Sequence, residues 1–330
     1  MTAATHPPRR LRPVTRRAAV AAVALLPAML RAQSADSGPV RLLVGYAAGG
    51  PVDGAARTFA PLLARELARP VLVENRPGAA GVLAADVVAK AVPDGAMLYF
   101  AASPSLTISP HVLKSMPLDP VRDLTPLAPL VSYANVLVVN KDLPVQNLQQ
   151  LLSLAREQPN KLFYGSAGVG ASNHLSGELL AAKAGVKLTH VPYKGNLPAM
   201  NDVIGGQLSM MFDIVSTARG FIQGGRVRAL AVTSRERNAS LPEVPTMREA
   251  GLPDYEVIGW YGLYGPARMT ADAVGRLNAA ANQALADAGL RKLWLDQGYD
   301  LWSGKPEVLA EQMRRDLEMW RGVTKGIQIE

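Results

Sequence analysis

A glycine-rich loop at residues 162–180 carries the residue types best suited to binding chemistry. Its sequence, LFYGSAGVGASNHLSGELL, is typical of a short strand, a loop of small residues and the start of a helix. Gly165, Gly168 and Gly170 let the backbone bend and let a ligand approach closely. A helix that begins near Ser172 leaves its first N–H groups without partners and carries partial positive charge at that end. The loop therefore predicts an anion site, for which we favour a carboxylate.

A second loop, YAAGGPVDGAAR at residues 46–57, repeats this order of strand, glycine-rich loop and helix start. Its candidate binding residues are Tyr46, Gly49, Gly50 and Asp53. Two interpretations stay open: the glycines form a tight turn and Asp53 only caps the helix, or the N–H groups of the loop face a ligand. Two such loops on separate lobes would hold a ligand from both sides, at the carboxyl ends of strands where open α/β sheets bind ligands.

Polar side chains beside predicted strand ends and helix starts are further candidates. His174 lies in the first turn of the predicted helix, where a neutral imidazole can donate a hydrogen bond to a carboxylate or simply bond a nearby carbonyl. Asp213 ends a predicted strand and touches either a solute or the loop backbone. Ser103 and Ser105 follow another strand, where their hydroxyls bond a polar ligand or cap the next turn.

Patterns typical of catalysis, metal binding and nucleotide binding are missing. Tyr164 stands where the nucleophile motif G-x-S-x-G requires its first glycine, and the four histidines form no H-E-x-x-H pair. The glycine loops match neither G-x-x-x-x-G-K-[ST] nor G-x-G-x-x-G. We therefore expect a protein that is not an enzyme and has no cofactor, no metal and no catalytic residue.

The first 33 residues are typical of a secretory signal peptide. Five arginines precede an apolar run at residues 18–30, and the first acidic residue is Asp36. Arg16 and Arg17 could belong to a twin-arginine signal, but no bulky apolar residue follows at once, so we favour ordinary secretion. No other stretch reaches the roughly 20 apolar residues of a membrane span, and we expect a soluble periplasmic protein.

The charge and composition of the remaining chain argue against nucleic-acid binding, disulfides and thiolate metal sites. Removing six arginines of the N-terminal segment from the formal net charge of +8 leaves +2. No basic run interleaved with aromatic residues remains, so nucleic acid is not an expected partner. The chain has no cysteine, which excludes disulfides and thiolate metal sites.

Alternating strand and helix patterns predict an α/β fold with parallel βαβ units. About 300 residues exceed one usual core, so we expect two lobes, with crossings at residues 135–140 and 257–264. After Pro266 the pattern is wholly helical. The predicted strands are 40–46, 71–75, 97–102, 135–140, 161–165, 189–193, 208–213, 228–233 and 257–265. The predicted helices are 53–69, 82–91, 148–156, 271–286, 290–297 and 307–320.

Several segments together resemble the extracytoplasmic solute receptors of tripartite tricarboxylate transporters, the Bug-type receptors. The matching segments are AGGPVDGAAR, VENRPGAAGVLAADVVAKAVPDG, YGSAGVGASNHLSGELL, HVPYKGNLPAMNDVIGGQLSMMFD, RVRALAVTSRER, LPEVPTMREAGLPDYEV and GWYGLYGP. The resemblance implies a type II periplasmic-binding-protein fold: two α/β lobes joined by a hinge, with a small anionic solute in the cleft. We place lobe 1 at residues 36–135 plus 258–330 and lobe 2 at 136–257.

The resemblance also implies site residues, position by position. The two loops would contribute Gly49, Gly50, Asp53, Ser166, Gly168, Gly170, Ser172 and His174. Tyr193, Lys194 and Asp213 match motif positions near the cleft. The chain departs from the family with Gly45, Ala47 and Val52, where proline, proline and often threonine are usual, and with Ala96 and Met97 where an aromatic residue and threonine are usual. These departures bear on the ligand rather than on the fold.

The expected function is capture of a small carboxylate solute by a monomeric receptor and its delivery to membrane transporter subunits. Two alternatives are a sensor that presents the solute to a signalling partner and an enzyme on the same scaffold. The sequence does not choose among aliphatic dicarboxylates, tricarboxylates, amino acids and aromatic acids.

Overall fold

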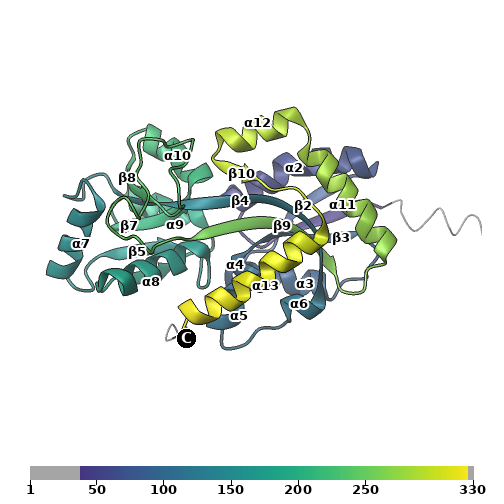
Figure 1. Ribbon diagram of the computed structural model, residues 1–330, viewed down its shortest axis with the longest axis horizontal. Helices are drawn as coiled ribbons and strands as arrows, with labels where there is room; N and C mark the ends of the chain where they lie inside the picture. The colour runs from purple at the N-terminus through teal and green to yellow at the C-terminus, as the bar shows by residue number, and fades with distance from the viewer. Residues whose placement is uncertain (1–37, 326–330) are drawn as a thin grey trace, which may run out of the picture. The chain divides into compact units, whose positions relative to one another are not determined.

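Two antiparallel strands, β4 (Leu124–Asn140) and β9 (Ile258–Pro266), run side by side through the fold (Figure 1). The computed structural model describes residues 38–325. In these residues the strands join in one sheet with the order β2-β1-β3-β9-β4-β7-β5-β6, and β8 and β10 also pair with β4. The other strands are β1 Val40–Val44, β2 Val71–Asn75, β3 Met97–Ala102, β5 Phe163–Ser166, β6 Thr189–Pro192, β7 Met210–Ile214, β8 Val227–Val232 and β10 Tyr299–Leu301.

Strand β4 changes partners along its length. Its first part, up to Ala134, pairs with β9, whereas from Asn135 onward it pairs with β7 and β8. Strands β1, β2 and β3 are parallel on one side, and β5, β6 and β7 are parallel on the other. The parallel βαβ units and the α/β class are therefore confirmed, with antiparallel strands between the two parallel groups.

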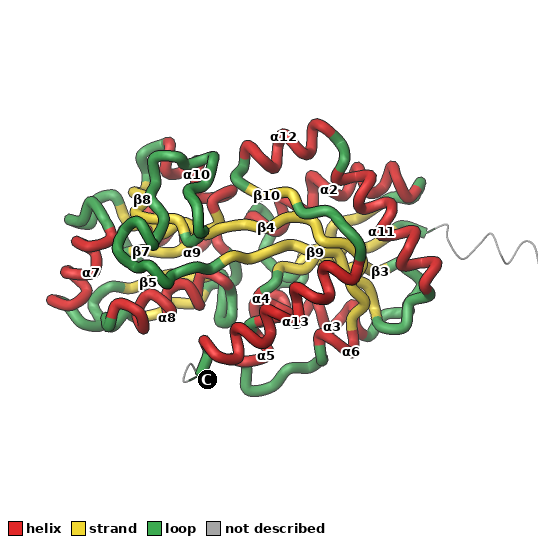
Figure 2. Tube along the Cα trace, viewed as in Figure 1, coloured by secondary structure: helices red, strands yellow, loops and turns green. Residues whose placement is uncertain are grey.

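Helices cover the sheet (Figure 2). Their apolar side chains are buried in the core clusters against it. Phe59 and Leu63 of α2 pack with Trp294 of α12 in one core cluster, and Leu309 and Met313 of α13 belong to another. The helices are α2 Pro51–Leu67, the 3-10 helix η1 Ala79–Gly81, α3 Val82–Ala89, α4 Pro104–Thr107, α5 Ser109–Val112, α6 Pro120–Asp123, α7 Leu148–Glu157, α8 Ser172–Ala184, α9 Asn196–Ile204, α10 Val215–Gln223, α11 Ala271–Leu285, α12 Ala288–Asp296 and α13 Pro306–Val323.

Two strand segments differ from the sequence prediction. The first half of β4 contains Pro126 and Pro129, which argue against a central strand because proline cannot donate to the ladder. Both prolines lie at register shifts between β4 and β9, so irregular pairing accommodates them. The prediction of a wholly helical chain after Pro266 is wrong, because β10 pairs with β4 there. Three residues are too few to produce a strand pattern.

The predicted signal peptide, residues 1–33, lies outside the described residues. The partner change in β4 falls at the predicted lobe boundary, but the boundaries themselves stay a prediction. Within residues 38–325 no helix has the length and apolar character needed to cross a membrane.

Candidate functional site

The two glycine-rich loops line one small cavity from different sides. Its volume is about 10 Å³, roughly the space that one water molecule needs. The lining residues are Tyr46, Val52, Ala102, Pro104, Tyr133, Ala167, Ala171, Ser172, Asn173, Asn196 and Ile214. A second cavity of about 10 Å³ separates residues 46–51 of the first loop from residues 195–198. The structure therefore brings together the loops that the sequence analysis paired.

Besides the single-turn helix α4, which begins at Pro104, four longer helices begin at this cavity. Val52 belongs to the first turn of α2, Ser172 and Asn173 begin α8, Asn196 begins α9, and Ile214 is the N-cap of α10. Helix N-termini carry unpaired N–H groups and partial positive charge, which suit an anion.

The cavity offers backbone donors in place of charged side chains. Among the described residues, no hydrogen bond uses the backbone N–H of Ser172 or of Asn173. None of the residues that line the cavity in the described part of the chain is lysine, arginine or histidine. An anion held here would be bound by helix ends, hydroxyls and amides.

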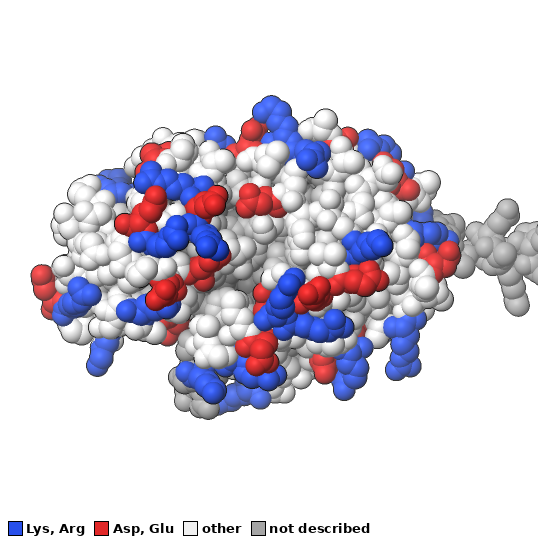
Figure 3. All heavy atoms as spheres, viewed as in Figure 1, with Lys and Arg blue, Asp and Glu red and all other residues white. Residues whose placement is uncertain are grey.

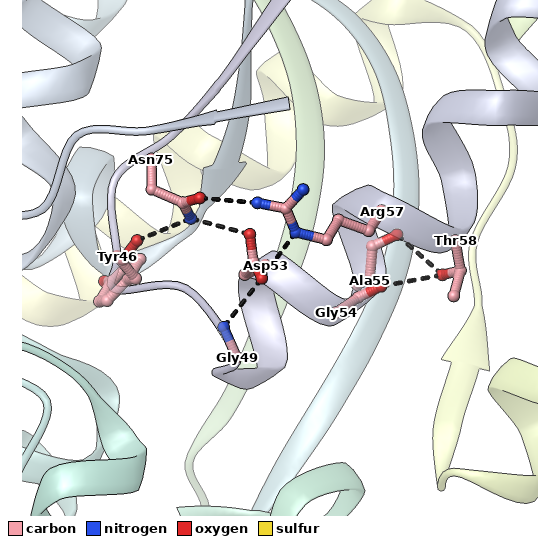
Figure 4. A network of polar contacts seen from close by, with 8 residues as sticks. All are labelled: Tyr46, Gly49, Asp53, Gly54, Ala55, Arg57, Thr58 and Asn75. Atoms are coloured by element: carbon pink, nitrogen blue, oxygen red, sulfur yellow. Dashed lines mark hydrogen bonds and ion pairs between the residues drawn. The ribbon is translucent and has the colours of Figure 1, made fainter. Parts of the chain in front are cut away.

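Asp53 ties the first loop together (Figure 4). Its Oδ2 accepts hydrogen bonds from the Gly49 N–H and from Arg57 Nε, each at 2.9 Å, and its Oδ1 accepts one from Asn75 Nδ2 at 2.8 Å. The same Asn75 amide donates to the carbonyl of Tyr46 at 3.1 Å. Burial alone would raise the pKa of Asp53, but these hydrogen bonds outweigh it and hold the pKa below its usual value.

The helix after this loop begins earlier than predicted. Gly50 is the N-cap and Pro51 the first residue of α2, so Pro51 starts the helix rather than ending the strand, and Asp53 is not the N-cap. Gly49 has φ +80°, a conformation that favours glycine. Tyr46 lines the cavity, and its hydroxyl donates to the carbonyl of Ala80 at 2.7 Å.

The second loop has its own internal bonds. The Gly168 N–H donates to Ser166 Oγ at 3.1 Å, and that hydroxyl lies 2.6 Å from His190 Nε2. Gly168 has φ +130° and Gly170 has φ +82°, so both positions favour glycine. Ser166 and the two glycines shape the loop but do not line the cavity, whereas Ser172 does. The predicted start of α8 at Ser172 is confirmed.

His174 is 3% exposed and lies beneath the loop, outside the cavity lining. Its Nδ1 accepts a hydrogen bond from the Gly170 N–H at 3.2 Å, and its ring stacks on His190 with the centroids 4.1 Å apart. Burial and the neighbouring His190 lower the pKa of His174 to about 3, and burial lowers the pKa of His190 to about 4. Both rings are therefore neutral at pH 7, and His174 positions the loop that carries the donors.

Ser103 and Ser105 bond to the surrounding core. The Ser103 hydroxyl accepts the Trp260 N–H at 3.2 Å. The Ser105 hydroxyl donates to the Ala102 carbonyl and accepts from the Tyr99 hydroxyl, both at 2.8 Å. Neither lines the cavity, and Ser103 is the N-cap of α4.

Of the remaining two candidates, Tyr193 bonds to a side chain of α9, whereas Asp213 is buried beside the cavity. The Tyr193 hydroxyl donates to Asp202 Oδ2 on α9 at 2.5 Å. Asp213 is fully buried beside the cavity: its Oδ1 accepts from the Ile214 N–H at 2.8 Å and from Asn196 Nδ2. Its Oδ2 has no partner among the described residues. Burial raises the pKa of Asp213 to about 7, well above the usual range of an aspartate.

Sequence reasoning missed three polar lining residues: Tyr133, Asn173 and Asn196. Asn173 Oδ1 accepts the Ala167 N–H at 3.0 Å, which folds the loop back onto the helix start. Asn196 follows the segment HVPYKG, and its place at the start of α9 was the available signal. Tyr133 lies in the first half of β4, which was not predicted as a strand because it contains prolines.

Comparisons with known proteins place this chain in a family. The model of the tripartite tricarboxylate transporter family receptor matches residues 55–328. The chain belongs to this family.

Individual relatives of the receptor agree in length and fold. A Pseudomonas sp. (strain P51) protein, described as a UPF0065 protein in the tcbD-tcbE intergenic region, is 39% identical over 91% of this chain and 90% of its own. The periplasmic binding protein BugD matches with a TM-score of 0.85 and 31% identity, covering 88% of this chain and 99% of BugD. MatC from Rhodopseudomonas palustris with bound malate matches with a TM-score of 0.83 and 32% identity, covering 86% of this chain and 98% of MatC.

These matches confirm the predicted periplasmic-binding-protein fold and the Bug-type resemblance. The family is one of receptors, BugD is a periplasmic binding protein and MatC was solved with bound malate. Membership of this family supports the expectation that the chain is not an enzyme.

Proposed function

We propose that this receptor captures a small carboxylate solute at the cavity between its two glycine-rich loops. The observation that carries the proposal is the meeting of four helix N-termini at a cavity whose described lining residues carry no charge. Such a site suits an anion without needing a cationic side chain. The malate held by MatC, a relative with the same fold, supports a carboxylate over a phosphate.

Access to the site requires the loops to separate. A cavity of about 10 Å³ cannot hold a dicarboxylate the size of malate. We place the two lobes at residues 36–135 plus 258–330 and 136–257, so that the chain crosses between them within β4, where that strand changes partners, and again at the start of β9. Bending at these strands opens the cleft, and a ligand that both loops contact favours the closed form.

The site residues divide into two roles. Tyr46, Ser172 and the missed residues Asn173 and Asn196 contact the solute, together with the N–H groups of the helix starts. The others, including Asp53, Ser166 and His174, hold the loops in shape. Asp213 adjoins the site through Asn196 and influences the charge that the solute meets.

The receptor delivers this solute to the membrane subunits of a tripartite transporter. Export by the N-terminal signal segment places it in the periplasm, where it works as a monomer without a cofactor. Uptake of radiolabelled solute by cells that hold the membrane subunits tests this step: uptake must be lost when the receptor gene is deleted and return when the receptor is supplied again.

A thermal-shift screen of carboxylic acids, followed by calorimetry, tests the binding site. A ligand at about 100 times its Kd stabilises the native state by about 2.7 kcal/mol and raises the melting temperature. Asn196→Ala should weaken binding of the acid that is found by at least about tenfold, since a hydrogen bond to a charged group contributes roughly 1.5–3 kcal/mol. Asn201→Ala, an exposed position on the same helix, is the matched control. Equal affinity in both variants would reject the site.

A further inference from the structure

A much larger cavity, of about 540 Å³, lies against other residues than the carboxylate site. It is lined by strands β4, β9 and β10 and by the later turns of α13, and it shares no lining residue with the cavity between the loops. The face drawn in Figure 3 is hollowed near its middle, with acidic and basic side chains around the hollow. A volume of this size is within the range of small-molecule pockets, roughly 300–1,000 Å³.

Two indole rings form the aromatic part of this cavity. Trp260 of β9 is 2% exposed, and Trp302 follows β10 and is half-buried. Their ring centroids are 6.3 Å apart at an interplanar angle of 69°, so the edge of one ring meets the face of the other. Leu301 and the half-exposed Met319 add apolar surface. This wall suits a ligand with an apolar body.

The charged groups of the cavity are both acidic. Asp316 of α13 is 8% exposed; its Oδ2 accepts the indole N–H of Trp260 at 2.6 Å, and its Oδ1 accepts from Gln312 Nε2 at 2.8 Å. Glu256 precedes β9 and is exposed. Among the described residues that line the cavity, none is lysine or arginine.

A cation outside the lining also acts on Asp316: burial raises the pKa of Asp316, and the charge of Arg315 acts against that rise. Arg315, which neighbours Asp316 in the chain, has an exposed side chain that forms an ion pair with Glu311 at 3.3 Å. Among the described lining residues no cationic side chain neutralises the acidic pair, and the exposed Arg315 acts on Asp316 only from outside the lining. A buried carboxylate is stabilised strongly by a positive charge brought beside it, because the low dielectric hardly screens the attraction.

We propose that this cavity binds a small organic cation, an alkylammonium group joined to an apolar body. Trp302 and Trp260 supply indole rings, the side chains that attract ammonium groups best through the ring quadrupole. Glu256 and Asp316 supply the opposite charge, and Leu301 and Met319 contact the apolar part. A cavity of this volume fits a free small molecule, and this ligand is separate from the carboxylate solute of the loop site.

Titration of the mature chain with three cations tests the proposal: choline, phenethylamine and 1,4-diaminobutane. The readouts are calorimetry and tryptophan fluorescence. We expect at least one cation to bind, and choline to bind at least about tenfold more tightly than its uncharged analogue 3,3-dimethylbutan-1-ol. Absence of binding by all three cations up to about 10 mM, or equal binding of choline and the alcohol, overturns the proposal.

Variants of two accessible residues locate the bound cation. Glu256→Gln and Trp302→Leu should each weaken it by at least about tenfold, and Trp302→Phe should restore part of the loss. Glu243→Gln, a matched change at another exposed glutamate, and Asn196→Ala in the loop site should leave the cation affinity unchanged. Circular dichroism checks that each variant is folded. Unchanged affinity in both Glu256→Gln and Trp302→Leu contradicts the proposed site.

Discussion

The backbone N–H of Gly49 donates a hydrogen bond to Asp53 Oδ2 across 2.9 Å, four residues further along the chain. This bond closes the first glycine loop on itself, so the carboxylate that the sequence offered as a ligand contact holds the loop instead. Arg57 and Asn75 occupy the remaining positions around the same carboxylate. A loop fixed in this way presents the first turn of α2 to the cavity without rearrangement.

Asp53→Asn should therefore destabilise the protein. The exchange removes a buried charge that accepts hydrogen bonds from three donors. It should lower the free energy of unfolding at pH 7 by roughly 1–3 kcal/mol. Because the folded-state pKa of Asp53 lies below its unfolded value, this stability is present above about pH 4 and is lost as the pH falls through the folded pKa. Urea unfolding at pH 7 and pH 3 measures both effects. Asp142→Asn, at an exposed ion pair with Lys141, should change little; an equal loss in the two variants contradicts this role.

The stacked pair His174 and His190 should make the second loop sensitive to acid. Their folded pKa values of about 3 and 4 lie below the unfolded value near 6.5. The unfolded chain binds more protons between these values, so stability falls as the pH drops below about 6.5 and is unaffected above it. His174→Asn should lose less stability than the wild type between pH 7 and pH 5 in urea unfolding. The same loss in both proteins would show that this pair does not titrate as proposed. Glu178, whose Oε1 lies 3.9 Å from His174 Nε2, also faces this ring.

Asp213 should make carboxylate binding weaken at alkaline pH. Its pKa is about 7, its Oδ1 accepts from the lining residue Asn196, and its Oδ2 has no partner among the described residues. Its ionisation therefore puts a negative charge next to the bound acid. Affinity should fall on the order of tenfold between pH 6 and pH 8. In Asp213→Asn the profile should be flat over this range, since both histidines are already neutral. Calorimetry at three pH values measures the carboxylate affinity of the wild type and of the variant. If the affinity changes with pH in the same way in both proteins, Asp213 is not the cause.

Gly170→Ala should damage both the fold and the site. Gly170 has φ +82°, and an added Cβ would lie 3.1 Å from Ser109 Oγ. The strained backbone and the close contact should cost roughly 1–3 kcal/mol. Gly185→Ala is the matched control: it also has positive φ, at +62°, but its Cβ would meet open space. Only Gly170→Ala should also weaken carboxylate binding. Equal unfolding free energies with unchanged affinity would argue against a fixed loop.

The sequence located both loops because glycine, small residues and helix starts leave a local signal that survives without tertiary contacts. Ser172 at the start of α8 is an example. The sequence carries no such signal for the direction of individual side chains. Ser105 bonds to Tyr99 and Tyr193 bonds to Asp202, and both hydrogen bonds depend on residues that folding brings close.

The errors in the fold prediction share a physical reason. The prolines of β4 are tolerated because the register with β9 shifts beside them, and β10 exists because it pairs with a strand more than 160 residues earlier in the chain. Both depend on long-range pairing, which local periodicity does not reveal. Asn196 had a local signal, its place after HVPYKG at a helix start, but only the folded chain brings that helix start to the first loop.

We propose that backbone N–H groups at a helix start hold the carboxylate. Nuclear magnetic resonance of the ¹⁵N-labelled mature chain measures this contact, once the screen has identified an acid that binds. We expect the amide protons of Ser172 and Asn173 to move downfield on saturation, while those of Ser153 and Gly185 stay in place. Saturable binding of the acid with no movement of the Ser172 and Asn173 resonances would contradict it.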